Sequence, residues 1–320
     1  MFGILYVLTN SHIQGWSILP NDDEYTKQKN FYASLNPNEK KIFLIGSSQI
    51  YALNTTYIHQ YLIENNQNYT IYNLAVAGDK PISRLDTIDM LISSHPDLVV
   101  YEISDRDFAN WNSPDSFQDN QPIIPILPDP QSIFKYSLGL NTLLSFNHGL
   151  TSSPKVSFLS SIGVRVSPDS FQNVSTNAQN PYPNLPFSKI SGYFEIENDN
   201  ELRSNQLGEA ISNIDPAPIN ENALVMNEII KKLHDNNIKI TVFSAPEQRY
   251  HLENMGNDRI RAFDLVIKYI SSQSNIHIYN FFDKYADLPI FADLIHVAVN
   301  NNSSIYSQDI SEIILKEIEK

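Results

Sequence analysis

A serine after the first apolar run of the chain and a histidine–aspartate pair near the other end carry the groups that acyl-transfer chemistry needs. The apolar segment 42–45 leads into a Gly-Ser-Ser turn at 46–48, and Asp293 precedes His296 by three residues. A serine hydroxyl becomes a good nucleophile when a histidine removes its proton and a carboxylate holds the other ring nitrogen. Because Asp293 is close to His296 in sequence, it can orient the imidazole. Ser48, Asp293 and His296 are therefore candidates for a catalytic triad.

These residues also have a purely structural interpretation. Serine is a favoured N-cap residue of helices, so one interpretation is that Ser48 caps a helix and has no catalytic role. His296 can lie in a surface loop beside an unrelated aspartate. Of the eight histidines, His251 and His296 are expected in loops at the carboxyl ends of core strands, and Asp293 favours the second.

Metal and cofactor sites have little support in the sequence. Asp283, Asp287, Asp293 and His296 offer possible ligands, but their spacing matches no strong metal-binding motif. The residues around Gly78 form neither a dinucleotide fingerprint nor a phosphate-binding loop. We therefore expect no cofactor and no metal.

Short apolar runs alternate with segments of helical periodicity, as in a doubly wound sheet. Strands are expected at 42–45, 70–74, 98–103, 238–244 and 276–280. Amphipathic helices are expected at 50–64, 81–92, 221–233, 259–271 and 310–318. This order predicts an α/β fold with a flavodoxin-like five-stranded parallel sheet. A long insertion follows the third strand.

The chain is expected to divide into three parts. Residues 1–39 form an N-terminal arm, or the end of a truncated membrane anchor followed by a hydrophilic spacer. Residues 40–108 and 221–320 form the α/β domain. Residues 109–220, rich in Pro, Asn and Ser, form the insertion, with short helices of its own around 131–146. A lid, a partner surface and a membrane-facing cap all fit this insertion, which is too long for a plain loop.

Composition limits the classes of partner. The net charge of −14 argues against a nucleic-acid surface, because phosphates attract Lys and Arg. The absence of cysteine excludes disulfides and thiolate–metal sites. Five Asn-X-Ser/Thr sites, at Asn54, Asn68, Asn173, Asn301 and Asn302, slightly favour an exported protein. We expect an extracellular or membrane-anchored cell-surface protein, possible membrane association through the N-terminus and, as the alternative, a cytoplasmic location.

Three short blocks resemble those of the SGNH (GDSL-type) hydrolases, in the branch whose first block reads Gly-Ser-Ser. The blocks are 46–48, the segment 73–78 (Asn-Leu-Ala-Val-Ala-Gly) and the Asp-X-X-His segment 293–296. They follow the first, second and fifth strands, as in that family. The resemblance implies that Ser48 is the nucleophile. It also implies that the backbone N–H groups of Ser48 and Gly78 bind the oxyanion.

The third block of the family is altered in this chain. That block, Gly-X-Asn-Asp, supplies an asparagine to the oxyanion site, whereas the segment 101–108 contains no asparagine. Losing one oxyanion donor typically costs about 10²–10³ in rate. Ser104 or Arg106 can replace it, since a guanidinium is a strong donor to developing negative charge. Alternatively, Arg106 only pairs with a neighbouring aspartate.

The resemblance implies a serine-dependent esterase or O-acyltransferase. The long insertion and the candidate anchor are similar to the surface-glycan members of the superfamily, so an acylated glycan or similar ester is the expected substrate. The altered third block leaves an alternative, a catalytically weak or inactive binding or scaffold protein of the same fold at the cell surface. Nothing in the sequence indicates the oligomeric state.

Overall fold

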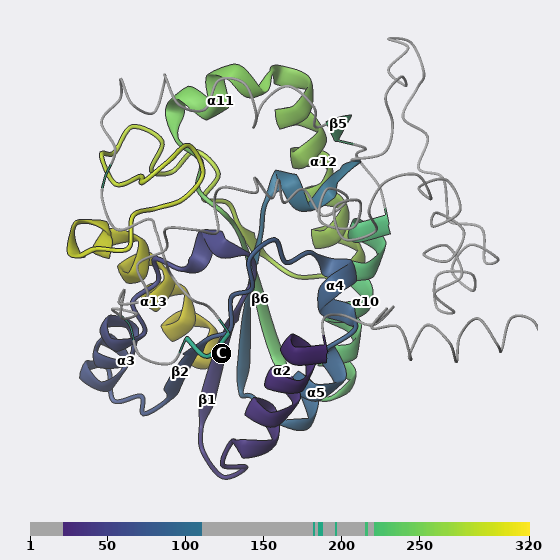
Figure 1. Cartoon of the computed structure of the whole chain (residues 1–320), viewed down its shortest axis with the longest axis vertical. Coiled ribbons are helices and arrows are strands. Elements are labelled where there is room, and N and C mark those ends of the chain that lie inside the picture. The colour runs from purple at the N-terminus through teal and green to yellow at the C-terminus, as the bar shows by residue number, and fades with distance from the viewer. Residues whose placement is uncertain (1–21, 111–181, 183–184, 188–195, 197–214, 217–220) are drawn as a thin grey trace, which may run out of the picture.

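A five-stranded parallel sheet forms the centre of the molecule (Figure 1). The computed structural model describes residues 22–110, 182, 185–187, 196, 215–216 and 221–320. The strands of the sheet are β1 (Lys41–Ile45), β2 (Thr70–Asn73), β3 (Leu98–Ile103), β6 (Lys239–Ser244) and β7 (Ile278–Tyr279). Their order is β2-β1-β3-β6-β7, and every neighbouring pair is parallel. The predicted flavodoxin-like sheet is confirmed.

Helices cover both faces of this sheet. They are α2 (Asp22–Ser34), α3 (Thr55–Glu64), α4 (Pro81–Leu85), α5 (Ile88–Ser93), α10 (Glu221–Asp235), α12 (Asn257–Ser274) and α13 (Ser304–Ile318). A further helix, α11 (Arg249–Met255), lies beyond the carboxyl ends of the strands (Figure 1). Ile42 and Leu44 of β1 belong to the core shared with α3 and α13, whereas Phe43 and Ile45 belong to the core shared with α2, α5, α10 and α12. Figure 1 shows these two groups of helices on opposite sides of the sheet.

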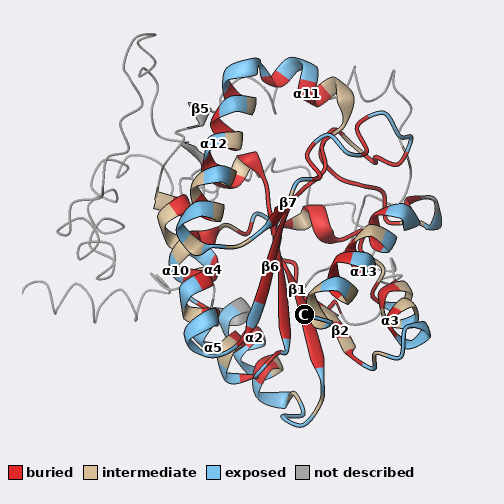
Figure 2. Cartoon of the chain, turned by 180° about the vertical axis from the view of Figure 1, so that it is seen from behind, coloured by how far each residue is buried: buried red, intermediate tan, exposed pale blue. Residues whose placement is uncertain are grey.

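Burial on both faces explains why the central strands read as continuous apolar runs. All residues of β1 and β3 are buried, as the red strands in Figure 2 show. Two charged residues interrupt the pattern, Lys41 and Glu102. The Lys41 ammonium donates to the backbone carbonyls of Asn36 and Glu39, at 2.9 and 3.0 Å. Glu102 has a partner at the end of β1 and belongs to the site described below.

Three sequence-based predictions differ from the structure near the sheet. The helix expected at 50–64 begins only at Thr55, capped by the Asn54 side chain, after a separate 3₁₀ turn η1 (Ser48–Ile50). The helix expected at 81–92 is split into α4 and α5. The split changes the helical phase, and Ile82 is exposed instead of facing the core. His251 lies in α11 and not in a loop.

The N-terminal helix α2 packs against the α/β domain. The ring of its residue Tyr32, 4% exposed, lies 6.0 Å from that of Phe43 in β1, and Phe31 makes an edge contact with Tyr72 at 5.6 Å. The predicted domain boundary at residue 40 therefore falls inside a packed unit, and residues 22–34 are not a spacer. Residues 1–21 lie outside the described part of the chain.

The two ends of the predicted insertion lie together. Strand β4 (Ala109–Asn110) pairs antiparallel with β5 (Asp215–Pro216), close to the carboxyl end of β3. Most of the insertion, including the helices expected around 131–146, lies outside the described residues, so its role stays a prediction. None of the helices that can be described has the length and apolar character to span a bilayer.

Candidate active site

The turn after β1 is held by a buried glutamate from the neighbouring strand. Gly46 has φ +149°, and a Cβ there would lie 2.7 Å from Glu102 Cβ and closer still to its carboxylate, so only glycine fits. The Glu102 carboxylate accepts hydrogen bonds from the Ser47 N–H at 2.7 Å and the Ser47 hydroxyl at 3.1 Å. Burial raises the pKa of Glu102 well above its usual range. Ser48 is left half-buried at the carboxyl end of β1.

The two serines of the turn have different roles. Ser47 is the N-cap of η1, and its hydroxyl accepts from the Gln49 N–H at 3.3 Å. Capping, the alternative considered for Ser48, is therefore the role of Ser47. The Ser48 Oγ instead lies 2.8 Å from His296 Nε2, although 248 positions separate the two residues in sequence. The predicted proximity of these two side chains is confirmed.

The histidine is oriented by the aspartate three residues before it. His296 Nδ1 lies 2.7 Å from Asp293 Oδ2, and Asp293 Oδ1 accepts the N–H groups of Ile295 and His296 at 2.9 and 2.7 Å. Burial alone would raise the pKa of Asp293, but hydrogen bonds from His296 and Ile295 hold it below its usual value. The aspartate is thus ionised at neutral pH. Its carboxylate accepts a hydrogen bond from His296 Nδ1–H and so selects this tautomer, which leaves the Nε2 lone pair facing Ser48.

The second block places Gly78 after β2 in a left-handed conformation, with φ +69°. The block begins at Asn73, whose side chain donates to the Ile50 carbonyl at 2.7 Å and so ties β2 to the turn that carries Ser48. Gly78 is exposed, and the backbone N–H groups of Ser48 and Gly78 bond to no other residue in the described part of the chain. Both remain the predicted oxyanion donors.

The structure separates the two candidates for the third donor. The Ser104 N–H donates to Asp107 Oδ2 at 2.6 Å, and the Ser104 hydroxyl also bonds to the Asp107 carboxyl group, so both donors of Ser104 are occupied. Arg106 is half-buried, and the described residues include no ion pair between it and either neighbouring aspartate. Asp105 binds Arg259, and Asp107 accepts from Ser104. Arg106 therefore fits the donor role better than Ser104. Its role as the third oxyanion donor stays a prediction.

The alternative base and the possible metal ligands named in the sequence analysis add nothing further to this site. His251 is completely buried, and burial lowers its pKa to about 4, so it is neutral at pH 7. Asp287 forms a two-bond ion pair with Arg249, at 2.7 and 2.8 Å, and Asp293 is engaged with His296. Within the ranges the structure describes, no group of three or more His, Asp or Glu could hold a metal ion.

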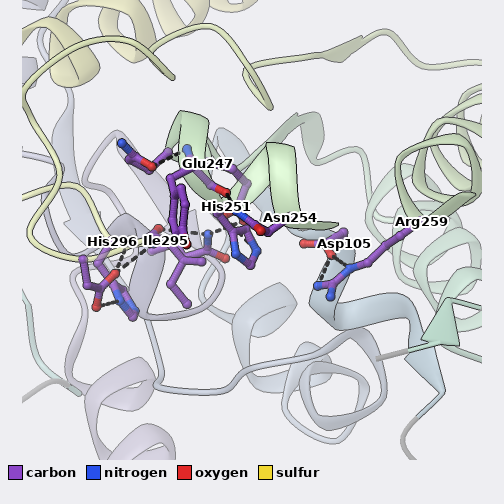
Figure 3. Close-up of polar contacts among 11 residues, drawn as sticks. Asp105, Glu247, His251, Asn254, Arg259, Ile295 and His296 are labelled. Atoms are coloured by element: carbon purple, nitrogen blue, oxygen red, sulfur yellow. Dashed lines mark hydrogen bonds and ion pairs between the residues drawn. The ribbon is translucent and has the colours of Figure 1, made fainter. Parts of the chain in front are cut away.

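The sequence analysis missed three buried polar residues beside the triad: Gln49, Glu102 and Glu247. Glu102 gave a signal, because it is the one charged residue in the apolar run 98–103. Gln49 and Glu247 gave none, since their role depends on contacts between loops that are far apart in sequence. Figure 3 shows Glu247 beside His251, with His296 on one side and the Asp105–Arg259 ion pair on the other.

Comparisons with known proteins give limited information. No protein-family model matches the chain, and no curated protein matches it. Three similar solved structures are TesA (TM-score 0.43, 12% identity, 85% of this chain and 96% of that chain), esterase EstA from Pseudoalteromonas sp. (0.39, 11%, 88% and 97%) and a variant of Axe2, an acetyl-xylooligosaccharide esterase from a Geobacillus (0.42, 10%, 85% and 93%). Similarity at this level carries no argument about activity, so function is argued from the site.

Proposed function

We propose that this protein is a serine-dependent esterase or O-acyltransferase of the SGNH type. The observation that carries the proposal is the continuous hydrogen-bonded chain from Ser48 through His296 to Asp293, with distances of 2.8 and 2.7 Å. This is the arrangement that converts a serine hydroxyl into a nucleophile at neutral pH.

The geometry supports a two-step acyl transfer. Ser48 Oγ attacks the ester carbonyl while His296 Nε2 takes its proton, and Asp293 stabilises the imidazolium. The N–H groups of Ser48 and Gly78, with Arg106, stabilise the oxyanion. The tetrahedral intermediate collapses, the alcohol leaves with the proton from His296, and the acyl group stays on Ser48. Water or a sugar hydroxyl then attacks the acyl-enzyme with His296 as the base.

A cavity with a polar, uncharged lining favours an uncharged, hydroxyl-rich substrate, and Ser48, Asp293 and His296 are not part of that lining. The cavity, about 270 Å³, is lined by residues of the two segments that follow Ser48 and His296 and by one residue of the insertion. Its lining is Ala52, Asn54, Tyr57, Tyr182, Asn300, Asn301, Ser304 and Ser307. Aromatic rings with amide and hydroxyl groups, and no charge, suit a sugar ring. The lining therefore favours an acylated glycan.

Turnover of aryl esters tests the function. We expect the wild-type protein to release nitrophenolate from 4-nitrophenyl acetate, with a burst that reports the acyl-enzyme. Adding an oligosaccharide acceptor divides the acetyl group between water and sugar, which separates an esterase from an acyltransferase. No release above the protein-free rate with acetyl, propionyl and butyryl esters would instead favour the binding or scaffold protein.

The cavity predicts a selective effect of Tyr57→Ala. The KM for an acetylated oligosaccharide should rise about 5- to 10-fold, because a ring contact is worth roughly 1 kcal/mol. Turnover of 4-nitrophenyl acetate, which lacks the sugar, should change little. Tyr25→Ala, which removes an exposed tyrosine of α2, is the matched control. Equal loss on both substrates would show that Tyr57 does not contact the glycan.

A further inference from the structure

The side chain of Gln49 connects the loop that carries Ser48 to two other loops of the site. Gln49 is only 3% exposed, and its amide nitrogen donates to the Ile295 carbonyl at 3.1 Å and to Glu247 Oε1 at 3.2 Å. Both N–H groups of the amide are thus used. Because a backbone carbonyl can only accept, the bond to Ile295 requires the amide to present its nitrogen on this side.

The connection reaches the two catalytic positions directly. Gln49 is the residue after Ser48, and Ile295 is the residue before His296. The Gln49–Ile295 bond therefore joins the two backbone segments at the point where the Ser48–His296 hydrogen bond must form. In chemistry that depends on near-contact geometry, a misplacement of about 1 Å can lower the rate about 10²-fold.

The other end of the connection is also tied to the loop of His296. Glu247 is completely buried, and its N–H donates to the Phe282 carbonyl at 2.9 Å, while the Gln248 N–H donates to the Leu294 carbonyl at 3.1 Å. These bonds join the segment after β6 to the segment after β7. Gln49 thus contacts two segments that are already bound to each other.

The surroundings of Glu247 favour the neutral form of its carboxyl group. Burial raises the pKa of Glu247 well above its usual range. The neighbouring His251, whose Nε2 lies 3.6 Å from Glu247 Oε2, is neutral at pH 7 because burial lowers its pKa to about 4. The charged groups beyond His251, Asp105 and Arg259, form an ion pair with each other. The Oε1 atom of Glu247 can accept from Gln49 in either protonation state of the carboxyl group.

We propose that Gln49 is a positioning residue that sets the placement of Ser48 relative to His296, through its hydrogen bonds to Ile295 and Glu247. It touches no reacting atom itself. The kinetic part of this proposal rests on the proposed esterase or acyltransferase function, whereas its structural part does not.

Gln49→Met tests the proposal, because methionine has a similar volume and makes neither hydrogen bond. We expect kcat for 4-nitrophenyl acetate to fall about 10- to 10²-fold with little change in KM, since the loss affects the placement of the reacting groups. Gln308→Met, at an exposed glutamine of α13, is the matched control. Glu247→Gln keeps the acceptor oxygen and should lose less activity than Glu247→Leu.

Hydrogen–deuterium exchange gives a measurement that needs no activity. In Gln49→Met, the amides of 293–297 should exchange faster than in the wild type, while those of β1 and β3 stay protected. If the wild type has no turnover but exchange rises as expected, the proposed function fails and the positioning role stands. If exchange at 293–297 is unchanged, or if kcat and KM match the wild type, Gln49 does not position the site.

Discussion

Replacing Ser48 by alanine is expected to lower kcat for ester hydrolysis about 10⁴- to 10⁶-fold, because no other group can form the acyl intermediate. The fold should be unaffected. Ser48 does not cap η1, and its hydroxyl contacts His296 rather than Glu102. Steady-state kinetics with 4-nitrophenyl acetate measures the effect, and thermal unfolding should show a Tm within a few degrees of the wild type.

Ser47→Ala is the informative control for this prediction. It removes the hydroxyl bond to Glu102 and the cap of Gln49, so it should destabilise the protein by about 1–3 kcal/mol. Its effect on the chemical step should be much smaller than that of Ser48→Ala. The reverse ranking, with Ser47 essential and Ser48 dispensable, would mean that the nucleophile is assigned to the wrong serine.

Asp293→Asn is expected to lower kcat about 10⁴-fold. The retained Oδ1 can still accept from Ile295 and His296, so the loop should keep its shape. The new NH₂ group, however, would face His296 Nδ1 and favour the tautomer with its proton on Nε2. That nitrogen could then no longer accept the proton of Ser48.

The measurement for Asp293→Asn is kcat at saturating ester, together with a circular dichroism melt to confirm the fold. Because hydrogen bonds hold the pKa of Asp293 below its usual value, the carboxylate stays ionised across the neutral range. Wild-type activity should therefore show no loss from protonation of Asp293 above about pH 4. A variant that keeps more than a tenth of the wild-type kcat would limit Asp293 to a structural role in its loop.

The sheet could be predicted because its strands are buried on both faces. The segment 42–45 is then apolar throughout and 98–103 is apolar except for Glu102, and the alternation of such segments with helices leaves few topologies. The helical periodicity of 50–64 was misleading because buried residues before the helix extend the apolar pattern. Tyr51 and Leu53 are buried, but they lie in the turn before α3 and not in the helix.

The triad could be proposed from two short motifs, 46–48 and 293–296, because parallel strands bring their carboxyl ends to one edge of the sheet. The buried polar residues that surround the triad could not be predicted from the sequence. Gln49, Glu102 and Glu247 are polar residues whose burial is possible only with partners from other strands and loops. Helix α2 was hidden for a different reason, since its sequence is mostly polar and only a few residues such as Tyr32 contact the core.

Covalent labelling tests the central claim, the nucleophilic pairing of Ser48 with His296, most directly. The wild-type protein is treated with an alkyl fluorophosphonate, and the modified peptide is identified by mass spectrometry. We predict a single adduct, on Ser48, that forms at least about 10³-fold more slowly in His296→Gln because the base is missing. An adduct on another residue, or an equal labelling rate in His296→Gln, would contradict the account.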